Sequence, residues 1–262
     1  MKKNHLLIAL LLGLQVMAGN AQAADTNPGA APEPGAGTLW TEPKTGMEFV
    51  WAPSGCFQMG GDGSVFERPE HKVCVKGFWI GRYEVTQKQY QLVMGTNESL
   101  FKGAHNPADR VSWHDATDFA SKMSTLSGMN IRLPSEAEWE YACRAGGIHE
   151  LYCGKGAPDR LAWFDDNSKM ITHPVGQLTA NDWGLYDMSG NVWEWTQDCR
   201  NINYKSAPAD GSAWETGSCM MRVGRGGAWN NNPDVLRAAQ RKFDFAGGRD
   251  SFKGIRVIRM LP

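Results

Sequence analysis

Residues 184–195 read GLYDMSGNVWEW, and this is the most informative stretch of the chain. It lies within a long segment, from Ala145 to Gly227, made mostly of Gly, Asn, Asp and Ser with isolated Trp residues. About 80 residues without a clear helical or strand period far exceed an ordinary loop. Such a segment must be held by disulfides, metal ions or buried aromatic side chains. We therefore expect a fold with little regular secondary structure.

The composition around this stretch is that of a folded, near-neutral protein. The chain has 262 residues, of which 42% are hydrophobic and 21% charged, with a formal net charge of −1. This length supplies one large domain or two small ones and ample material for a buried core. The apolar fraction excludes a disordered chain, and the charge balance argues against a dedicated binder of nucleic acid or anionic membranes. The 11 tryptophans are an excess that we interpret mainly as core anchors.

The N-terminal segment has the pattern of a cleaved export signal. Lys2 and Lys3 give a positive start, an apolar run follows from Leu6 to Met17, and Ala21-Gln22-Ala23 is a pattern that signal peptidase recognises. The run is too short to span a bilayer of about 30 Å, and no cysteine is present for lipid attachment. We predict a signal peptide at 1–23, a flexible Ala/Pro/Gly-rich tether at 24–39 and one domain at 40–262. The mature protein is expected to be soluble and periplasmic, without stable membrane insertion.

Export changes the interpretation of the six cysteines. An even number in an oxidising compartment favours disulfides, although sequence alone does not choose among the possible pairings. Proximity along the chain suggests three local loops: Cys56–Cys74, Cys143–Cys153 and Cys199–Cys219. A zinc site is the alternative, but no Cys-x-x-Cys occurs and the nearest histidines are not at ligand spacing.

Capping signals indicate three short helices. Thr86 with Gln89 and Ser135 with Glu138 each form a capping box. A third helix is expected to start near Ser112, because an apolar stripe at helical spacing follows it. Strands are expected in three segments with β-branched or aromatic residues: Met47–Ala52, Lys72–Trp79 and Gly254–Met260.

Outward from residues 184–195, short phrases follow one another in a fixed order. Before this stretch come GCFQMG at 55–60, ERPEHKV at 67–73, IGRYEVT at 80–86, VSW at 111–113 and RLPSEAEWEY at 132–141. After it come RGGAW at 225–229, LRAA at 236–239 and GIR at 254–256. Any one phrase would be weak. The ordered set, over residues 44–260, resembles the formylglycine-generating enzyme (sulfatase-modifying factor) family.

That resemblance implies an α+β fold distantly related to the C-type lectin domain, with short helices and irregular antiparallel strands. It also implies a structural calcium site in the loop 187–194. Asp187 and Glu194 would donate side-chain oxygens, and Gly190 and Val192 backbone carbonyls. Calcium takes several hard oxygen ligands at flexible geometry, so these groups suit it. The alternative is that Asp187 is a turn residue and Glu194 a surface acid.

The chain departs from the family where its enzymes carry their catalytic thiols. Those enzymes bind copper through a cysteine pair, which suits Cu(I), and the first cysteine follows the Gly-Gly-Ser-aromatic phrase by two residues. Here Asn231 stands at that position and residues 232–241 contain no cysteine. We therefore expect neither copper nor formylglycine generation. The vacated region would be lined by residues that either recognise a peptide or polar ligand or complete a loop core: Trp229, Asn230, Asn231, Asn232, Arg237 and Arg241.

Two kinds of function are consistent with these observations. The first is an exported, non-catalytic accessory or regulatory protein that binds a protein or peptide partner. Its most concrete form is a regulator of a threonine-kinase pathway in a type VI secretion system. The second is a periplasmic oxidoreductase that matures a siderophore or another peptide-derived substrate, as in pyoverdine maturation. The missing thiols favour the first, and the retained scaffold keeps the second open.

Overall fold

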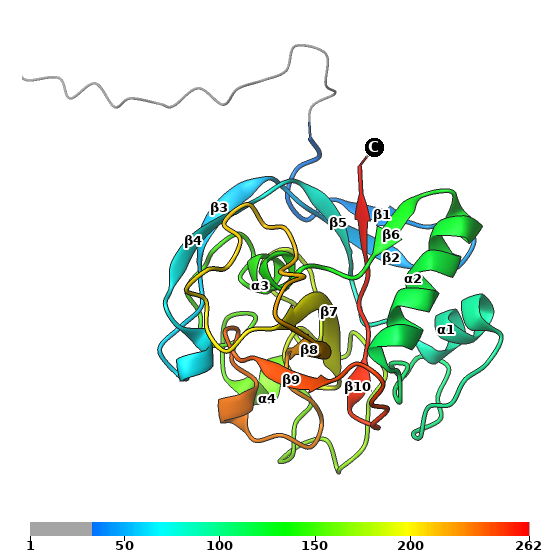
Figure 1. Cartoon of the computed structure of the whole chain (residues 1–262). Coiled ribbons are helices and arrows are strands. Elements are labelled where there is room, and N and C mark those ends of the chain that lie inside the picture. The colour runs from blue at the N-terminus through cyan, green and yellow to red at the C-terminus, as the bar shows by residue number, and fades with distance from the viewer. Residues whose placement is uncertain (1–32, 262) are drawn as a thin grey trace, which may run out of the picture. The chain divides into compact units, whose positions relative to one another are not determined.

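The computed structural model of the chain describes residues 33–261, so the predicted signal peptide and most of the predicted tether lie outside the described residues. Figure 1 shows short helices around small, separate sheets joined by long irregular segments. The strands are β1 (Leu39–Thr41), β2 (Glu48–Ala52), β3 (Gly55–Met59), β4 (His71–Val75), β5 (Phe78–Gly81), β6 (Asn130–Arg132), β7 (Trp193–Arg200), β8 (Ser218–Arg225), β9 (Lys242–Phe245), β10 (Lys253–Gly254) and β11 (Ile258–Met260). The helices are α1 (Gln87–Met94), α2 (Trp113–Ser127), α3 (Glu136–Cys143) and α4 (Pro158–Leu161), with 3-10 helices η1 (Val65–Glu67) and η2 (Pro233–Val235).

The strands form three sheets, and each larger sheet combines strands that are distant in sequence. A five-stranded antiparallel sheet has the order β1-β2-β5-β11-β6. A four-stranded sheet has the order β10-β7-β8-β9, with β10 parallel to β7 and the other pairs antiparallel. Strands β3 and β4 form an antiparallel ribbon. The α+β class with short helices and antiparallel strands is therefore confirmed.

The predicted helix starts are confirmed by side-chain caps. The Thr86 hydroxyl accepts a hydrogen bond from the Gln89 N–H, and the Gln89 side chain accepts one from the Thr86 N–H. Ser135 and Glu138 form the same reciprocal pair at α3. At α2 the partner of Ser112 is Asp115. These caps satisfy backbone donors that a helix otherwise leaves unpaired.

Two predicted strands are wrong in extent. The segment Lys72–Trp79 is divided at Lys76-Gly77 into β4, in the ribbon, and β5, in the five-stranded sheet. A Cβ at Gly77 would lie 2.5 Å from the Trp51 ring, so the close approach of that ring requires glycine there. The segment Gly254–Met260 is likewise divided between β10 and β11, which belong to different sheets. Strands β7 and β8 were not predicted.

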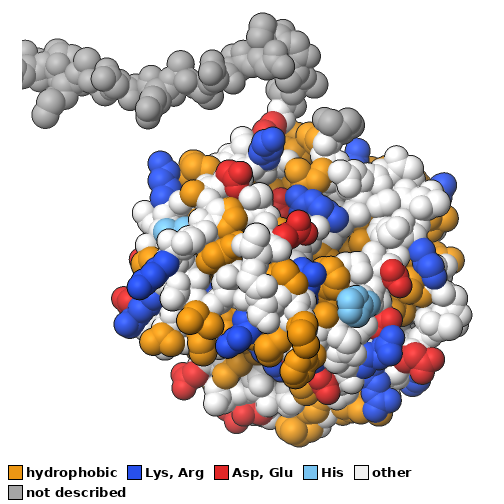
Figure 2. Space-filling view, viewed as in Figure 1, with side chains coloured by type: hydrophobic (Ala, Val, Ile, Leu, Met, Phe, Trp, Pro, Cys, Tyr) orange, Lys and Arg blue, Asp and Glu red, His pale blue; other side chains and the backbone are white. Residues whose placement is uncertain are grey.

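Large aromatic side chains fill the core, as predicted from the tryptophan excess. Trp51 and Trp139 have no exposed surface, and Trp195 is 2% exposed. Trp51 packs in the cluster between the five-stranded sheet, α1 and α2, and Trp139 in the cluster around α3, β3 and β4. Figure 2 shows that some hydrophobic side chains nevertheless remain on the surface.

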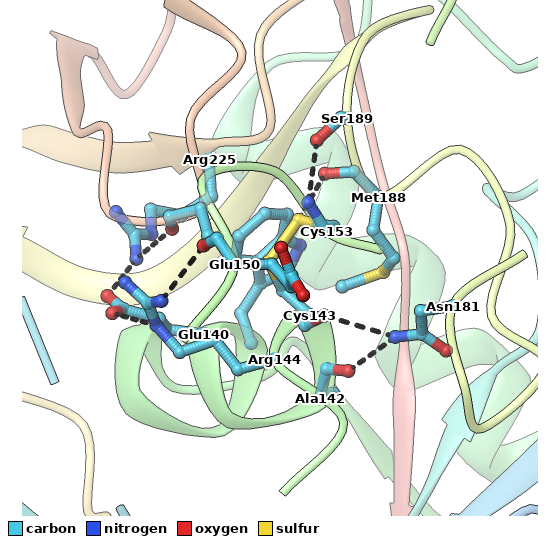
Figure 3. The surroundings of a disulfide bond; sticks show 12 residues. Glu140, Ala142, Cys143, Arg144, Glu150, Cys153, Asn181, Met188, Ser189 and Arg225 are labelled. Carbon is cyan, nitrogen blue, oxygen red and sulfur yellow. Dashed lines mark hydrogen bonds and ion pairs between the residues drawn. A yellow bond between two sulfur atoms is a disulfide. The ribbon is translucent and has the colours of Figure 1, made fainter. Parts of the chain in front are cut away.

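All three predicted disulfides are confirmed: Cys56–Cys74, Cys143–Cys153 and Cys199–Cys219. Figure 3 shows the second, which ties the end of α3 to the segment at Cys153. The Asn181 amide stabilises that helix end by donating to the carbonyls of Ala142 and Cys143 at 2.8 and 3.2 Å. Three disulfides are typical of extracytoplasmic proteins. Within residues 33–261, no helix is long and apolar enough to cross a bilayer.

The described end of the predicted tether is hydrogen-bonded to the domain. The Glu33 carboxylate accepts from the Ser54 N–H at 3.1 Å. The Gly37 N–H donates to the Trp51 carbonyl at 3.0 Å, and Leu39 pairs with Val50 in β1–β2.

Candidate functional site

The loop from Asp187 to Glu194 is fixed in an irregular conformation by the segments beside it. Asp187, Gly190 and Asn191 have φ angles of 55°, 84° and 57°, in the left-handed region. Position 190 requires glycine, because a Cβ there would lie 2.4 Å from the Trp163 carbonyl oxygen. The same oxygen accepts from the Asn191 N–H at 2.8 Å. The Gly190 N–H donates to the Gly226 carbonyl at 2.9 Å, so the loop joins two distant parts of the chain.

Glu84 orders this loop, although no role for it was predicted from the sequence. Its side chain is buried, and its carboxylate accepts from the Val192 N–H at 3.0 Å and from the Asn191 amide at 2.6 Å. Burial raises the pKa of Glu84 well above its usual value, and the nearby Asp187 and Glu194 carboxylates raise it further. The sequence feature that could have indicated a role for Glu84 is its position within the phrase at 80–86.

Glu194 pairs with Arg256 in the interior. The guanidinium contacts both carboxylate oxygens at 2.6 to 3.0 Å, and the Trp139 indole N–H donates to Oε2 at 2.6 Å. Glu194 and Arg256 have no exposed surface. Arg256 also donates to the Gly81 and Tyr186 carbonyls, both at 2.8 Å. Since breaking a buried pair from one side costs about 3–5 kcal/mol, this contact holds the loop firmly against β5.

The surroundings of Asp187 fit a hard cation in two respects. Its Oδ2 accepts from the Gly176 N–H at 2.7 Å, but its buried Oδ1 has no hydrogen-bond partner among the described residues. Glu84, Asp187 and Glu194 share one guanidinium, that of Arg256, so the cluster has an excess of negative charge. Burial raises the pKa of Asp187 to about 6, which reflects the cost of this arrangement. Calcium would offset that charge through Asp187 and backbone carbonyls.

The fit is less direct at Glu194, because its carboxylate already accepts from Arg256 and Trp139. Within residues 33–261, no group of three or more His, Cys, Asp or Glu side chains is arranged to hold a metal ion. Calcium bound here would therefore depend largely on carbonyl ligands, such as those expected of Gly190 and Val192.

The predicted pocket residues 229–232 form one loop, and two of their side chains make hydrogen bonds that hold it in place. Trp229 is 7% exposed, and its indole N–H donates to the Ser251 carbonyl at 3.0 Å. The Asn231 side chain accepts from the Ala228 N–H at 2.9 Å. Asn230 is half-buried, and its Oδ1 has no partner among the described residues. Asn232 is exposed.

The two predicted pocket arginines lie in ion pairs instead. Arg237 makes a bidentate pair with Glu67 at 2.7 and 2.8 Å. It also lines a cleft of about 370 Å³ together with residues 60–63 and 149–151. Arg241 is 3% exposed and makes a bidentate pair with Glu136 at 2.6 and 2.8 Å. The structure therefore brings residues 229–232 together and gives each arginine an acidic partner of its own.

Asn231, which stands where the resemblance expects the first catalytic thiol of the family's enzymes, has a structural use in this chain. Asn231 uses its side-chain oxygen to accept from the turn at Ala228, and the Asp165 N–H donates to its backbone carbonyl at 3.1 Å. All six cysteines of the sequence lie in the described range, and all six are in disulfides.

Together, the small sheets, the capped helices, the three disulfides and the buried loop network define a disulfide-bonded α+β domain organised around the loop 187–194. The chain belongs to the family of the sulfatase-modifying factor enzyme 1-like domain, which matches residues 36–261.

Several proteins are similar to this chain over most of its length. "Chaperone protein LppX" of Paenibacillus barcinonensis is 32% identical over 243 residues, which cover 72% of this chain and 82% of that protein. "Serine/threonine-protein kinase pkn1" of Chlamydia caviae is 30% identical over 81% of this chain, but the match spans only 38% of the kinase. The structure of PvdO from Pseudomonas aeruginosa has a TM-score of 0.79 at 32% identity and covers 87% of this chain and 100% of PvdO. Treponema denticola variable protein 1 has a TM-score of 0.77 at 26% identity, covering 85% and 98%.

Proposed function

We propose that this protein is an exported accessory or regulatory binding protein, and that it does not generate formylglycine. Its most concrete form is a regulator of a threonine-kinase pathway associated with type VI secretion. The predicted signal at 1–23 would deliver it to the periplasm, where the three disulfides would be stable.

The observation that carries this proposal is the use made of the catalytic thiol position. Asn231 occupies it and caps the turn at Ala228, and every cysteine is engaged in a disulfide. A neutral amide cannot replace a thiolate as a soft ligand of Cu(I). With the redox centre replaced by a turn, the retained scaffold is better suited to binding.

Two of the similar proteins support an accessory role. One is named a chaperone, and it matches over 82% of its length. Another is named a serine/threonine-protein kinase, and this chain corresponds to 38% of it. A domain that accompanies a kinase in one polypeptide can act on a kinase as a separate protein in another. The activity of the whole kinase is not transferred by this argument.

The test is genetic complementation with a biochemical readout. A strain that lacks the gene should lose threonine phosphorylation of the pathway's target, measured by phosphothreonine immunoblot, and the exported protein should restore it. An Asn231→Ser variant should restore it equally well, because serine can also accept the Ala228 hydrogen bond. Unchanged phosphorylation in the deletion strain would contradict the kinase-pathway proposal.

A second candidate is a periplasmic oxidoreductase that matures a siderophore or another peptide-derived substrate. Its support is the match to PvdO, which extends over the whole of that protein at 32% identity. Oxygen uptake by the purified protein on a siderophore precursor, lost in Asn231→Ala, would favour this candidate over the first.

We also propose that calcium occupies the loop 187–194. The support is that the buried Asp187 Oδ1 has no partner among the described residues, and that Glu84 and Asp187 lie near an arginine, Arg256, that already pairs with Glu194. The ion would have a structural role, since it would relieve charge repulsion inside the fold.

A further inference from the structure

An exposed apolar surface lies where η1, β9 and the segment after β7 meet. We call it the apolar platform and define it by Val65, Phe66, Ile202, Phe243 and Phe245. Val65, Ile202 and Phe245 are 65%, 58% and 59% exposed, which is unusual for side chains of this size. Figure 2 views the side of the molecule that carries η1 and β9, and orange side chains gather over them in the lower part of the view. Contiguous apolar surface on a folded domain marks an interaction site.

The platform is continuous because its three segments are in contact. The Phe66 and Phe243 rings meet edge-on with their centroids 5.4 Å apart. Phe245 lies two residues beyond Phe243 on β9 and therefore projects from the same face of the sheet. The carbonyls of Phe66 and Asn201 both accept from Arg241, at 2.8 and 3.0 Å, so the backbone that leads into the exposed Ile202 lies beside η1.

Buried ion pairs hold the platform rigid from beneath. Arg241 is fixed by Glu136, and its guanidinium lies 5.0 Å from the centre of the Phe243 ring. Arg237 fixes Glu67, the last residue of η1, through two hydrogen bonds. Thus both arginines that were predicted to line a ligand pocket also lie beneath this exposed surface, and Arg237 lines the neighbouring cleft as well. A surface ordered before binding loses little conformational entropy when a partner docks.

One cation without an ion pair lies beside the platform. The Arg200 guanidinium is 5.6 Å from the centre of the Phe243 ring and has no ion pair among the described residues. Asp244 lies between the two phenylalanines in sequence, but its side chain belongs to the opposite face of β9 and pairs with Lys253 at 2.6 Å. The face with the phenylalanines therefore combines aromatic rings with an unpaired guanidinium.

We propose that the apolar platform docks an acidic segment of a partner protein that carries a leucine or phenylalanine anchor. The anchor would pack on Phe243 and Phe245, and a carboxylate beside it would pair with Arg200. A second copy of this chain is a poorer occupant, because a symmetric contact would bring the Arg200 cations of both copies to the same interface. This inference names the partner surface for the proposed accessory role and rests on that role.

The test uses the full mature protein and two synthetic peptides of equal length and apolar content. In one, aspartates flank a Leu-Phe anchor, and in the other, lysines take their place. Fluorescence anisotropy should show binding of the acidic peptide about tenfold tighter or more than of the basic peptide. Phe245→Ser should weaken it by about tenfold or more, and Arg200→Glu should reverse the preference between the peptides. Leu92→Ser is the control, because Leu92 is 57% exposed on α1, away from the platform.

Several outcomes would overturn the proposal. One is that the wild-type protein binds the two peptides equally well or binds neither. Another is that the variants, with unchanged melting temperatures, bind both peptides as the wild type does. Dimerisation in sedimentation experiments that Phe245→Ser abolishes would assign the platform to a second copy. Binding to anionic phospholipid vesicles that Phe245→Ser abolishes would assign it to a membrane. If the Phe245→Ser, Arg200→Glu double variant still complements the deletion strain, the platform is not the partner site but the accessory role stands. If wild-type protein fails to complement, the accessory role itself is wrong.

Discussion

Glu140 is the residue whose replacement tests most directly how this loop-rich domain is held together. Its carboxylate has no exposed surface. Oε1 accepts from the Gly60 N–H at 3.0 Å and from Arg144 at 2.9 Å, and Oε2 pairs with Arg225 (Figure 3). Arg144 is 5% exposed and Arg225 is fully buried, so neither guanidinium has water to replace a lost partner.

Glu140→Gln keeps the shape of the side chain and removes its charge. The amide can still accept from Gly60, but its NH₂ group would face the Arg225 donor and leave that guanidinium with only the more distant Glu136 carboxylate, at 3.8 Å. Removing one partner of a buried pair costs about 3–5 kcal/mol. For a domain of this size each kcal/mol lowers the melting temperature by about 2–4 °C, so we expect a decrease of roughly 6–20 °C. Such a loss is a large part of a typical total stability of about 5–15 kcal/mol.

The exposed pair Lys155–Asp182 is the matched control. Its N–O distance is 2.7 Å, but its side chains are 63% and 43% exposed. Asp182→Asn should therefore cost no more than about 1 kcal/mol. Arg225→Met added to Glu140→Gln should recover part of the loss, because it removes a buried charge that has lost its nearest carboxylate. Urea unfolding of the oxidised proteins measures all of these, provided that the slopes agree. If Glu140→Gln costs no more than Asp182→Asn, buried charge pairing does not hold this fold.

Three further predictions concern metal binding, pH and redox state. Calcium at about a hundredfold above its Kd should stabilise the protein by about 2.7 kcal/mol. Asp187→Asn should abolish this stabilisation, and the control Asp182→Asn should not. An unchanged melting temperature on chelation would contradict the calcium proposal. Burial and the neighbouring Glu136 raise the pKa of Asp198 to about 7, so the folded state retains a proton that the unfolded state loses near pH 4. Stability should therefore fall as pH rises from about 4 to about 7, and Asp198→Asn should flatten this slope in urea titrations at successive pH values. Finally, unfolded but non-reduced protein should expose no thiol to iodoacetamide, as measured by mass spectrometry, because all six cysteines are paired; alkylation of all six would refute the disulfide assignment.

The features that could be predicted from the sequence depend on residues close together in the chain. Capping boxes join residues three apart. The disulfides close loops of only 10 to 20 residues, which explains why proximity alone selected the correct pairs. The family phrases could be recognised because each is a short run in a fixed order. For the same reason, the loop 187–194 could be singled out from its sequence alone.

Strands β7 and β8 were not predicted, because the alternation of apolar and polar residues at Trp193–Thr196 does not continue through the rest of β7, and β8 has no regular alternation. Three polar residues of β7 are buried, namely Glu194, Thr196 and Asp198, although a sequence pattern would place polar side chains at the surface. Their partners lie elsewhere in the chain: Thr196 donates to the Val223 carbonyl, and Asp198 accepts from the Glu136 and Trp214 N–H groups. A buried polar group is tolerated only when such partners are in place.

The sequence by itself determined the family and the local caps, since both depend on residues that are neighbours in the chain, and it suggested the three cysteine pairs that the structure shows. Only the tertiary structure decided which charged side chains pair with one another. Glu84 reaches Asn191 across 107 positions, and Arg237 reaches Glu67 across 170. An arginine in a sequence could line a pocket or hold a core together, and its role depends on the carboxylate that the folded chain places within about 3 Å of it. For Arg237 and Arg241 the partners are Glu67 and Glu136, and Arg237 also lines a cleft.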